Sequence, residues 1–156
     1  MLKRFGINSG SENYRETAVY GLAYAYSLIE NKIADYLRPF GLSVAKFNAL
    51  LVVKHIGKEE GLSQGELGRR LIVTPSNITR LLDRLSQDGF IERLARKGDR
   101  RVHLIRITRE GSDILDKAWP GYYKKVHTIA NLMDEKKLRQ VSQGIVDWCG
   151  KLDNTV

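Results

Sequence analysis

The stretch from Ser63 to Thr108 reads SQGELGRRLIVTPSNITRLLDRLSQDGFIERLARKGDRRVHLIRIT. Its pattern predicts a short helix, a turn, a longer helix and a two-stranded hairpin, in that order. The sequence Gly98-Asp99-Arg100-Arg101 lies at the predicted tip of the hairpin. A helix has the width of the major groove of duplex DNA, and an arginine-bearing hairpin tip has the width of the minor groove. The stretch therefore predicts a module that binds duplex DNA.

Local signals set the predicted boundaries within this module. Ser63 and Glu66 have the spacing of a capping box, which predicts a helix from there to Leu71. Thr74 is a suitable cap for the second helix, and Pro75 suits its first position. Gly89 is expected to end that helix, whose buried face we predict to be Ile78, Leu81, Leu82 and Leu85. Residues 90–94 and 102–107 are the predicted strands.

The outer face of the second helix carries side chains that suit base and phosphate contacts. Asn can pair with adenine and Arg with guanine, whereas Ser and Thr mostly contact phosphates or a thymine methyl group. Simple capping is the alternative for Thr74, and an ordinary solvated face is the alternative for Asn77 and Arg80. We expect DNA contacts from Thr74, Ser76, Asn77, Thr79, Arg80 and Arg84.

The predicted hairpin tip combines several cations with one acid. Arginine in a minor groove exploits the negative potential there. Asp99 would face phosphates as a direct contact, so its expected role is to hold a neighbouring arginine in one rotamer. A flexible charged turn is the alternative. We expect the wing residues to be Arg96, Lys97, Asp99, Arg100 and Arg101.

Helices with narrow apolar seams are predicted on both sides of the module. Apolar residues recur at spacings of three and four in residues 14–37 and 138–152. Such a seam favours a partner helix, which predicts a homodimer; packing of the seams within one chain is the alternative. The expected dimerisation residues are Val19, Leu22, Leu138, Val141, Ile145 and Trp148. Pro120-Gly121 is expected to kink or break the helix that begins near Thr108.

These elements predict a mainly α fold with a small β-hairpin. We expect a loose arm at residues 1–12, an N-terminal dimerisation helix at 13–40, a DNA-binding domain at 43–108 and C-terminal dimerisation helices at 109–156. One domain with an extended dimerisation element fits a chain of 156 residues.

The bulk composition is consistent with a nucleic-acid partner. The formal net charge is +8, and residues 63–108 hold ten Arg or Lys against five Asp or Glu. With a single cysteine, Cys149, and no apolar run of membrane-spanning length, we expect a soluble, cytoplasmic protein. No nucleotide loop, zinc motif or cysteine pair is present, and His55, His103 and His127 are scattered. We therefore expect no enzyme activity, no cofactor and no metal site.

Several of these segments resemble the MarR-type (multiple antibiotic resistance regulator) winged helix-turn-helix family. The similar segments are Ser63–Leu67, Thr74–Leu85, Asp88–Arg93 and Asp99-Arg100-Arg101 with Leu104 and Ile107-Thr108. The resemblance implies that Arg101 enters the minor groove with Asp99 bracing it, in a dimer joined by its terminal helices.

The resemblance also implies a repressor of a pseudo-palindromic operator, released by a small aromatic ligand. Aromatic residues that could line a ligand pocket or simply form core are Tyr24, Tyr36, Trp119, Tyr122 and Tyr123. Cys149 does not match the position used by the peroxide-sensing branch. The alternative function is a broad-specificity architectural or counter-silencing DNA-binding protein without an effector.

Overall fold

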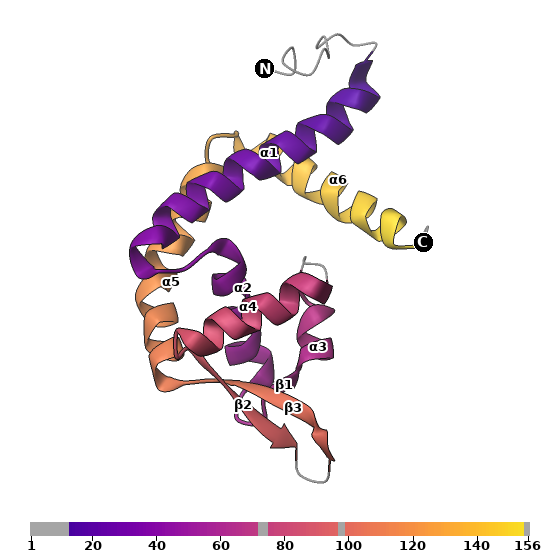
Figure 1. Ribbon diagram of the computed structural model, residues 1–156. Coiled ribbons are helices and arrows are strands. Elements are labelled where there is room, and N and C mark those ends of the chain that lie inside the picture. Colours follow the sequence, from indigo (N-terminus) through magenta and orange to yellow (C-terminus); the bar gives the residue numbers. More distant parts are fainter. Residues whose placement is uncertain (1–12, 72–74, 97–98, 155–156) are drawn as a thin grey trace. The chain divides into compact units, whose positions relative to one another are not determined.

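The computed structural model describes residues 13–71, 75–96 and 99–154, and for residues 75, 76, 96 and 99–102 it describes the backbone alone. In chain order the elements are α1 (Tyr14–Leu37), η3 (Arg38–Phe40), α2 (Val44–Val52), η4 (Val53–Gly57), β1 (Leu62–Ser63), α3 (Gln64–Gly68), α4 (Pro75–Gln87), β2 (Ile91–Arg96), β3 (Asp99–Ile107), α5 (Arg109–Ala130) and α6 (Glu135–Asp153) (Figure 1). The described residues form two compact units, which divide between Tyr122 and Tyr123. The predicted fold class, mainly helical with a small sheet, is confirmed.

One apolar core joins α2, α3, α4 and the sheet. The largest fully buried side chains come from elements throughout the first unit: Leu37, Phe47, Leu50, Val53, Leu67, Leu82, Leu85, Ile105 and Leu115. The predicted inner face of α4, Ile78, Leu81, Leu82 and Leu85, is buried as expected. Burial of one such side chain contributes about 1.5–3 kcal/mol. The core therefore fixes α4 firmly and leaves its opposite face to solvent.

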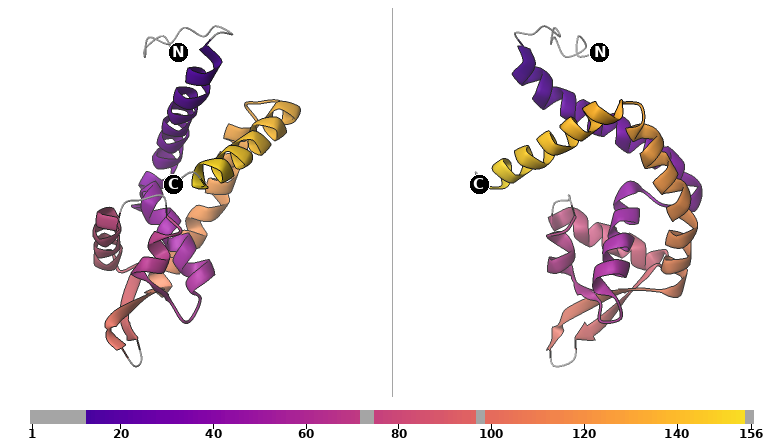
Figure 2. Two further views of the ribbon diagram at one scale, coloured as in Figure 1. Left: turned by 90° about the vertical axis from the view of Figure 1, so that its right-hand side faces the viewer. Right: turned by 180° about the vertical axis from the view of Figure 1, so that it is seen from behind.

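The three strands form an antiparallel sheet in the order β1-β3-β2. Leu62 of β1 pairs with Ile105 of β3, and Ile91 of β2 pairs with Ile107 of β3. The β2–β3 hairpin projects past the helices of the module in both views of Figure 2. Strand β1 was not predicted, because two residues are too few to show an alternating pattern.

Two predicted boundaries in the module are wrong. Helix α3 was predicted to reach Leu71 but ends at Gly68. A Cβ atom on Gly68 would lie 2.7 Å from Cδ1 of Ile78, so the chain turns where it comes closest to α4. The predicted hairpin loop is also too long, because the strands reach Arg96 and Asp99. Strand pairing uses backbone groups and so continues through polar residues, with an irregularity in register between Ala95 and Arg96.

The sequence predicts a kink or a break at Pro120-Gly121, and of these the break is wrong, because α5 continues through both residues. Tyr36 of α1 donates a hydrogen bond from its hydroxyl to the carbonyl of Ala118, at 2.9 Å. A Cβ atom on Gly121 would lie 2.2 Å from the same hydroxyl oxygen. The Pro-Gly pair therefore admits the Tyr36 ring against α5, and the buried Leu115 and Ala118 hold the helix in place.

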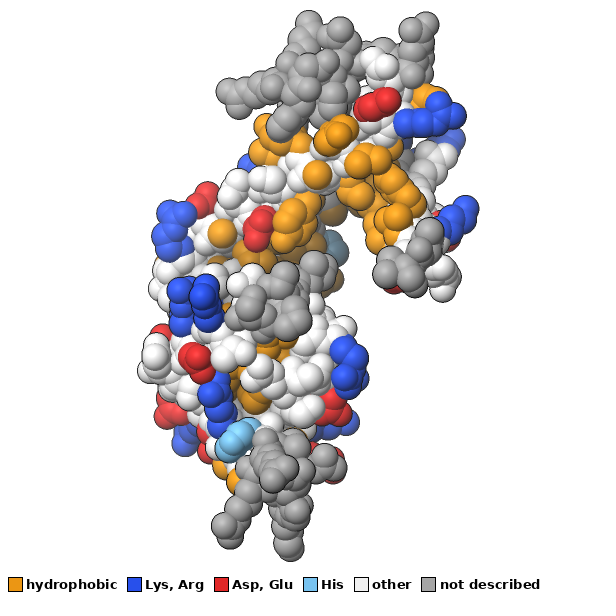
Figure 3. Space-filling view, turned by 45° about the vertical axis from the view of Figure 1, so that its right-hand side comes forward, with side chains coloured by type: hydrophobic (Ala, Val, Ile, Leu, Met, Phe, Trp, Pro, Cys, Tyr) orange, Lys and Arg blue, Asp and Glu red, His pale blue; other side chains and the backbone are white. Residues whose placement is uncertain are grey.

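Helix α1 is largely unpacked along its first half. Four apolar residues of its predicted seam are exposed: Val19, Leu22, Tyr26 and Ile29. Figure 3 shows hydrophobic side chains gathered along its surface. Only Ile33 and Leu37, near its C-terminal end, are buried.

In the second unit, none of the residues of α6 is buried. Its N-cap, Asp134, accepts a hydrogen bond from the backbone N–H of Lys137 at 3.0 Å, which lowers the pKa of this carboxyl group.

Within the described residues, no single helix is long and apolar enough to span a membrane. One helix pair, Tyr14–Phe40 with Val44–Gly57, reaches the length and composition together but is bent by 77°.

Candidate nucleic-acid interface

The exposed face of α4 presents the predicted contact residues Asn77, Thr79, Arg80 and Arg84 to solvent. With 3.6 residues per turn, Arg80 lies near the middle of this face. Thr79 lies to one side of it, while Asn77 and Arg84 lie to the other. Thr74 lies outside the described residues. Ser76 lies in the first turn of α4, where the backbone alone is described.

Cations on and near α4 differ in whether they have an acidic partner. Lys46, Arg93 and Arg106 form ion pairs with Asp88, Asp83 and Glu92, respectively. In contrast, Arg80 and Arg84 have no ion-pair or hydrogen-bond partner within the described part of the chain. Their guanidinium groups retain the donors that bind phosphate or the guanine edge. The unpaired positive charge of α4 is therefore concentrated on its exposed face.

A groove of about 300 Å³ runs between α4 and the first turn of α2. Asn77, Arg80 and Arg84 line one side of it, and Ser43 and Lys46 line the other. Its walls therefore carry three cationic side chains. An anionic group in this groove would meet Arg80 and Arg84, two polar side chains and Lys46, whose charge is already paired with Asp88.

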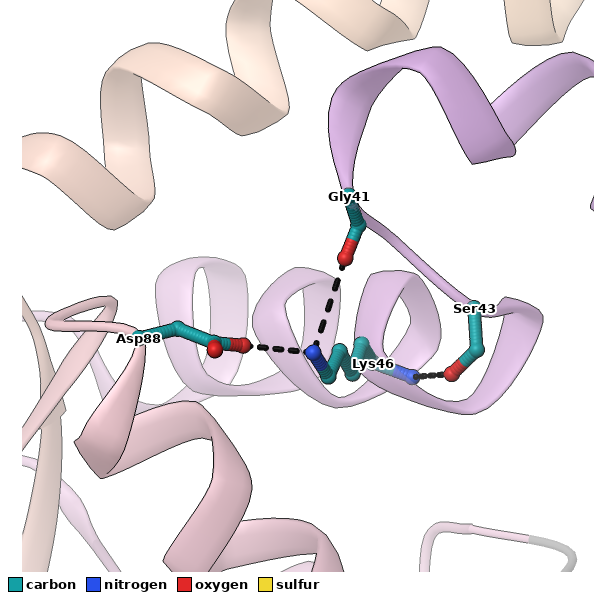
Figure 4. A network of polar contacts seen from close by, with 4 residues as sticks. All are labelled: Gly41, Ser43, Lys46 and Asp88. Carbon is teal, nitrogen blue, oxygen red and sulfur yellow. Dashed lines mark hydrogen bonds and ion pairs between the residues drawn. The ribbon is translucent and has the colours of Figure 1, made fainter.

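Lys46 joins α2 to the end of α4 and to the turn before α2 (Figure 4). Its Nζ donates to Oδ2 of Asp88 at 2.5 Å and to the carbonyl of Gly41 at 3.5 Å. Ser43 is the N-cap of α2, and its Oγ accepts from the backbone N–H of Lys46 at 3.2 Å. Lys46 was not singled out in the sequence, because no local pattern indicates a partner 42 residues away.

The first turn of α3 is fixed by the predicted capping box. Oγ of Ser63 accepts from the backbone N–H of Glu66, and Oε2 of Glu66 accepts from the backbone N–H of Ser63 at 2.9 Å. The hydroxyl of Ser63 also donates to Glu66 at 2.7 Å. Hydrogen bonds from the Ser63 side chain and then its backbone lower the pKa of Glu66. The next residue, Gln64, donates from Nε2 to Oγ1 of Thr79 at 2.9 Å and so links α3 to α4.

The hairpin is tied to α4 at its base. Arg93 of β2 pairs with Asp83 of α4, and Arg106 of β3 pairs across the hairpin with Glu92 of β2. Of the predicted wing residues, Arg96 ends β2 and Asp99, Arg100 and Arg101 begin β3, where only the backbone is described. Lys97 lies outside the described residues. The bracing of Arg101 by Asp99 stays a prediction.

A second cavity, of about 450 Å³, lies on the other side of α2. It is lined by residues of α1, α2, α5 and the segment after α3, among them Tyr26, Ile33, Asn48, Leu51, Arg70 and Tyr122. Ala45 lines both this cavity and the groove beside α4. Most of its lining is apolar, with a few polar groups, which is the usual composition of a small-molecule site.

The predicted dimerisation residues lie on exposed or half-buried surface. Val19 and Leu22 of α1 are exposed, as are Val141 and Ile145 of α6, while Leu138 and Trp148 are half-buried. No described group of three or more His, Cys, Asp or Glu side chains has a metal-binding arrangement.

Known proteins share both sequence and fold with this chain. Residues 48–103 match the model of the MarR family. The HTH-type transcriptional repressor YetL of Bacillus subtilis is 38% identical over 103 residues, which cover 65% of this chain and 61% of YetL. The HTH-type transcriptional regulator MhqR of the same organism is 25% identical over 122 residues, covering 78% of this chain and 82% of MhqR. The match thus spans about three fifths of YetL and most of MhqR.

Solved structures extend the similarity of fold over most of the chain. A mutant of E. coli MarR complexed with operator DNA is 20% identical, with a TM-score of 0.78 over 89% of this chain and 98% of that one. The organohalide-sensing regulator RdhR, in its ligand-free form, has a TM-score of 0.80 at 15% identity, over 92% of this chain and 86% of that one. The MarR family model thus matches residues 48–103, and the solved structures show that the fold of most of the chain is that of MarR structures.

Proposed function

We propose that this protein is a sequence-specific transcriptional regulator that binds duplex DNA as a homodimer and acts as a repressor. The observation that carries the proposal is the exposed face of α4, where Arg80 and Arg84 have no partner among the described residues, whereas Lys46 and Arg93 beside α4 and Arg106 in the hairpin are ion-paired. Free arginines on a helix beside a projecting hairpin fit adjacent grooves of one duplex. YetL, a relative, is named a transcriptional repressor.

The homodimer accounts for the unpacked seam on α1. Exposed apolar residues at helical spacing, such as Val19, Leu22 and Tyr26, are costly to leave in water and favour a partner helix. A two-fold dimer presents two copies of α4 and two hairpins, so its operator is a pseudo-palindrome.

The cavity beside α2 is the proposed effector site. Its apolar walls suit an aromatic ring, while Glu30, Asn48 and Arg70 supply polar groups for a phenol hydroxyl. Because Ala45 lines both this cavity and the groove beside α4, a ligand that shifts α2 changes the groove as well. A ligand that binds this shifted state more tightly lowers the affinity for DNA.

Selection of bound duplexes from a random pool tests the proposal. A regulator yields a pseudo-palindromic consensus and prefers it over random duplex by about 10³ or more at fixed salt. The net charge of +8 favours one other function, broad-specificity architectural binding. That function predicts no consensus and an affinity governed by salt alone. A screen of small phenols for loss of binding then tests the effector site.

A further inference from the structure

We propose that Gln64 and Thr79 together read one A·T base pair in the major groove, with Gln64 as a specificity-determining residue contributed by α3 rather than α4. The inference rests on the proposed function and names a base pair that the interface recognises. Both side chains are exposed, and Nε2 of Gln64 donates to Oγ1 of Thr79 at 2.9 Å.

The backbone that carries Gln64 is fixed from several directions. Ser63, the preceding residue, pairs with Leu104 of β3 and forms the capping box with Glu66. Leu67, on the next part of the helix, is fully buried. Because this helix start is already ordered, its backbone loses no further conformational entropy when the side chain of Gln64 binds.

The hydrogen bond to Thr79 orients the amide of Gln64. An amide nitrogen has two protons, so Gln64 retains one N–H and its carbonyl oxygen after donating to Thr79. One donor and one acceptor side by side are the groups that pair with N7 and the N6 amino group of adenine. Adenine is therefore the base that an amide held in this way recognises.

The same hydrogen bond fixes the side chain of Thr79. With its Oγ1 turned toward Gln64, the orientation of the Cγ2 methyl group is set as well, because the three substituents of Cβ rotate together. A methyl group on an exposed helix face makes apolar contact with the C5 methyl of thymine. An A·T pair presents the adenine edge and the thymine methyl side by side in the major groove, which matches the pair of side chains.

Base selection with variants of the full chain tests the inference. The wild type is expected to select A·T at one position in each half-site. Gln64→Ala and Thr79→Val should each reduce the preference for A·T over G·C at that same position by about tenfold. Their double variant should lose little more than either single variant, because the two act as one unit. Gln87→Ala, at the exposed C-terminal end of α4, is the matched control and should leave every position unchanged.

The possible results distinguish failure of this inference from failure of the proposed function. If the variants weaken binding to all sequences equally, Gln64 contacts phosphate or sugar and the inference is overturned. Unchanged base frequencies at every position, in variants whose thermal unfolding matches the wild type, also overturn it. Both results leave the proposed function intact. If the wild type itself selects no consensus, the proposed function fails, and the inference fails with it.

Discussion

Arg93 of β2 donates a hydrogen bond to Asp83 of α4, with 2.5 Å between Nη2 and Oδ1. Asp83 lies on the exposed side of α4, one turn beyond Arg80, where a free carboxylate would repel DNA phosphates. Both side chains are partly exposed, at 36% and 47%, so the pair contributes at most about 1 kcal/mol to stability. Its main effects are to neutralise the acid and to hold the hairpin against α4.

Arg93→Gln should therefore weaken binding to the selected operator by about tenfold, because it leaves Asp83 uncompensated beside the DNA. Asp83→Asn in the same background should recover most of the loss. A titration at fixed salt measures both effects. Arg106→Gln is the control, since its partner Glu92 lies within the hairpin and not on α4. Equal affinities for Arg93→Gln and the wild type would contradict this role of the pair.

The hairpin tip allows a test of the predicted minor-groove contact. Arg101→Ala should lose about 1–3 kcal/mol of operator affinity while the dimer stays folded. Asp99→Ala should weaken binding as well, although it removes a negative charge near DNA, because the arginine would no longer be held in position. Binding isotherms of the two variants at one salt concentration provide the measurement. Tighter binding by Asp99→Ala would favour simple electrostatics over bracing.

The close contact between α5 and the turn before β2 predicts a large loss of stability. A Cβ atom on Gly111 would lie 2.1 Å from the carbonyl oxygen of Phe90, which is backbone and cannot swing away. Gly111→Ala should therefore lower the free energy of unfolding by about 1–3 kcal/mol or more. Gly65→Ala is the matched control, because its Cβ atom would meet only the end of Arg69, at 3.9 Å. Urea titrations should find this variant as stable as the wild type or more so.

The exposed seam on α1 makes the proposed dimer testable. Leu22→Asp places a charge in the centre of the predicted helix contact, where desolvation of an unpaired carboxylate is costly. Sedimentation should show dissociation to monomers at concentrations where the wild type is dimeric. Ser27→Asp is the control, because Ser27 is a polar residue of the same helix that lies outside the seam. A dimeric Leu22→Asp protein would place the dimer contact elsewhere.

The features that could be predicted from the sequence are those determined by residues adjacent in the chain. The cap at Ser63 and the helix start at Pro75 follow from local hydrogen bonding and backbone restrictions, and the structure contains both. Gly89 has the expected positive φ of 75° at the end of α4. The spacing of the apolar residues likewise predicts the buried face of α4, because residues three or four apart lie on the same face of a helix.

The features that could not be predicted depend on contacts between distant segments. Lys46 meets Asp88 only after the core has brought α2 and α4 together. Of the kink or break predicted at Pro120-Gly121, the break does not occur, because contacts with Tyr36, far away in sequence, hold the helix from outside. The hydrogen bond from Gln64 of α3 to Thr79 of α4 likewise cannot be recognised from the residues next to Gln64 in the sequence.

The capping box of α3 predicts a specific dependence of stability on pH. The pKa of Glu66 is lowered from about 4.5 by hydrogen bonds from the Ser63 side chain and backbone. A carboxyl group whose pKa is lower in the folded state stabilises the fold above its unfolded pKa, and this contribution is lost as the pH falls through the folded value. Glu66→Gln keeps an acceptor but has no charge to lose.

The advantage of the wild type over Glu66→Gln in free energy of unfolding should therefore be constant above about pH 6 and shrink as the pH falls below about 4.5. Urea titrations of both proteins across this range measure the difference. Ser63→Ala, which removes the principal hydrogen bond, should lessen the pH dependence relative to the wild type in the same way. An advantage of the wild type that stays the same at every pH would mean that Glu66 acts through shape alone and not through its charge.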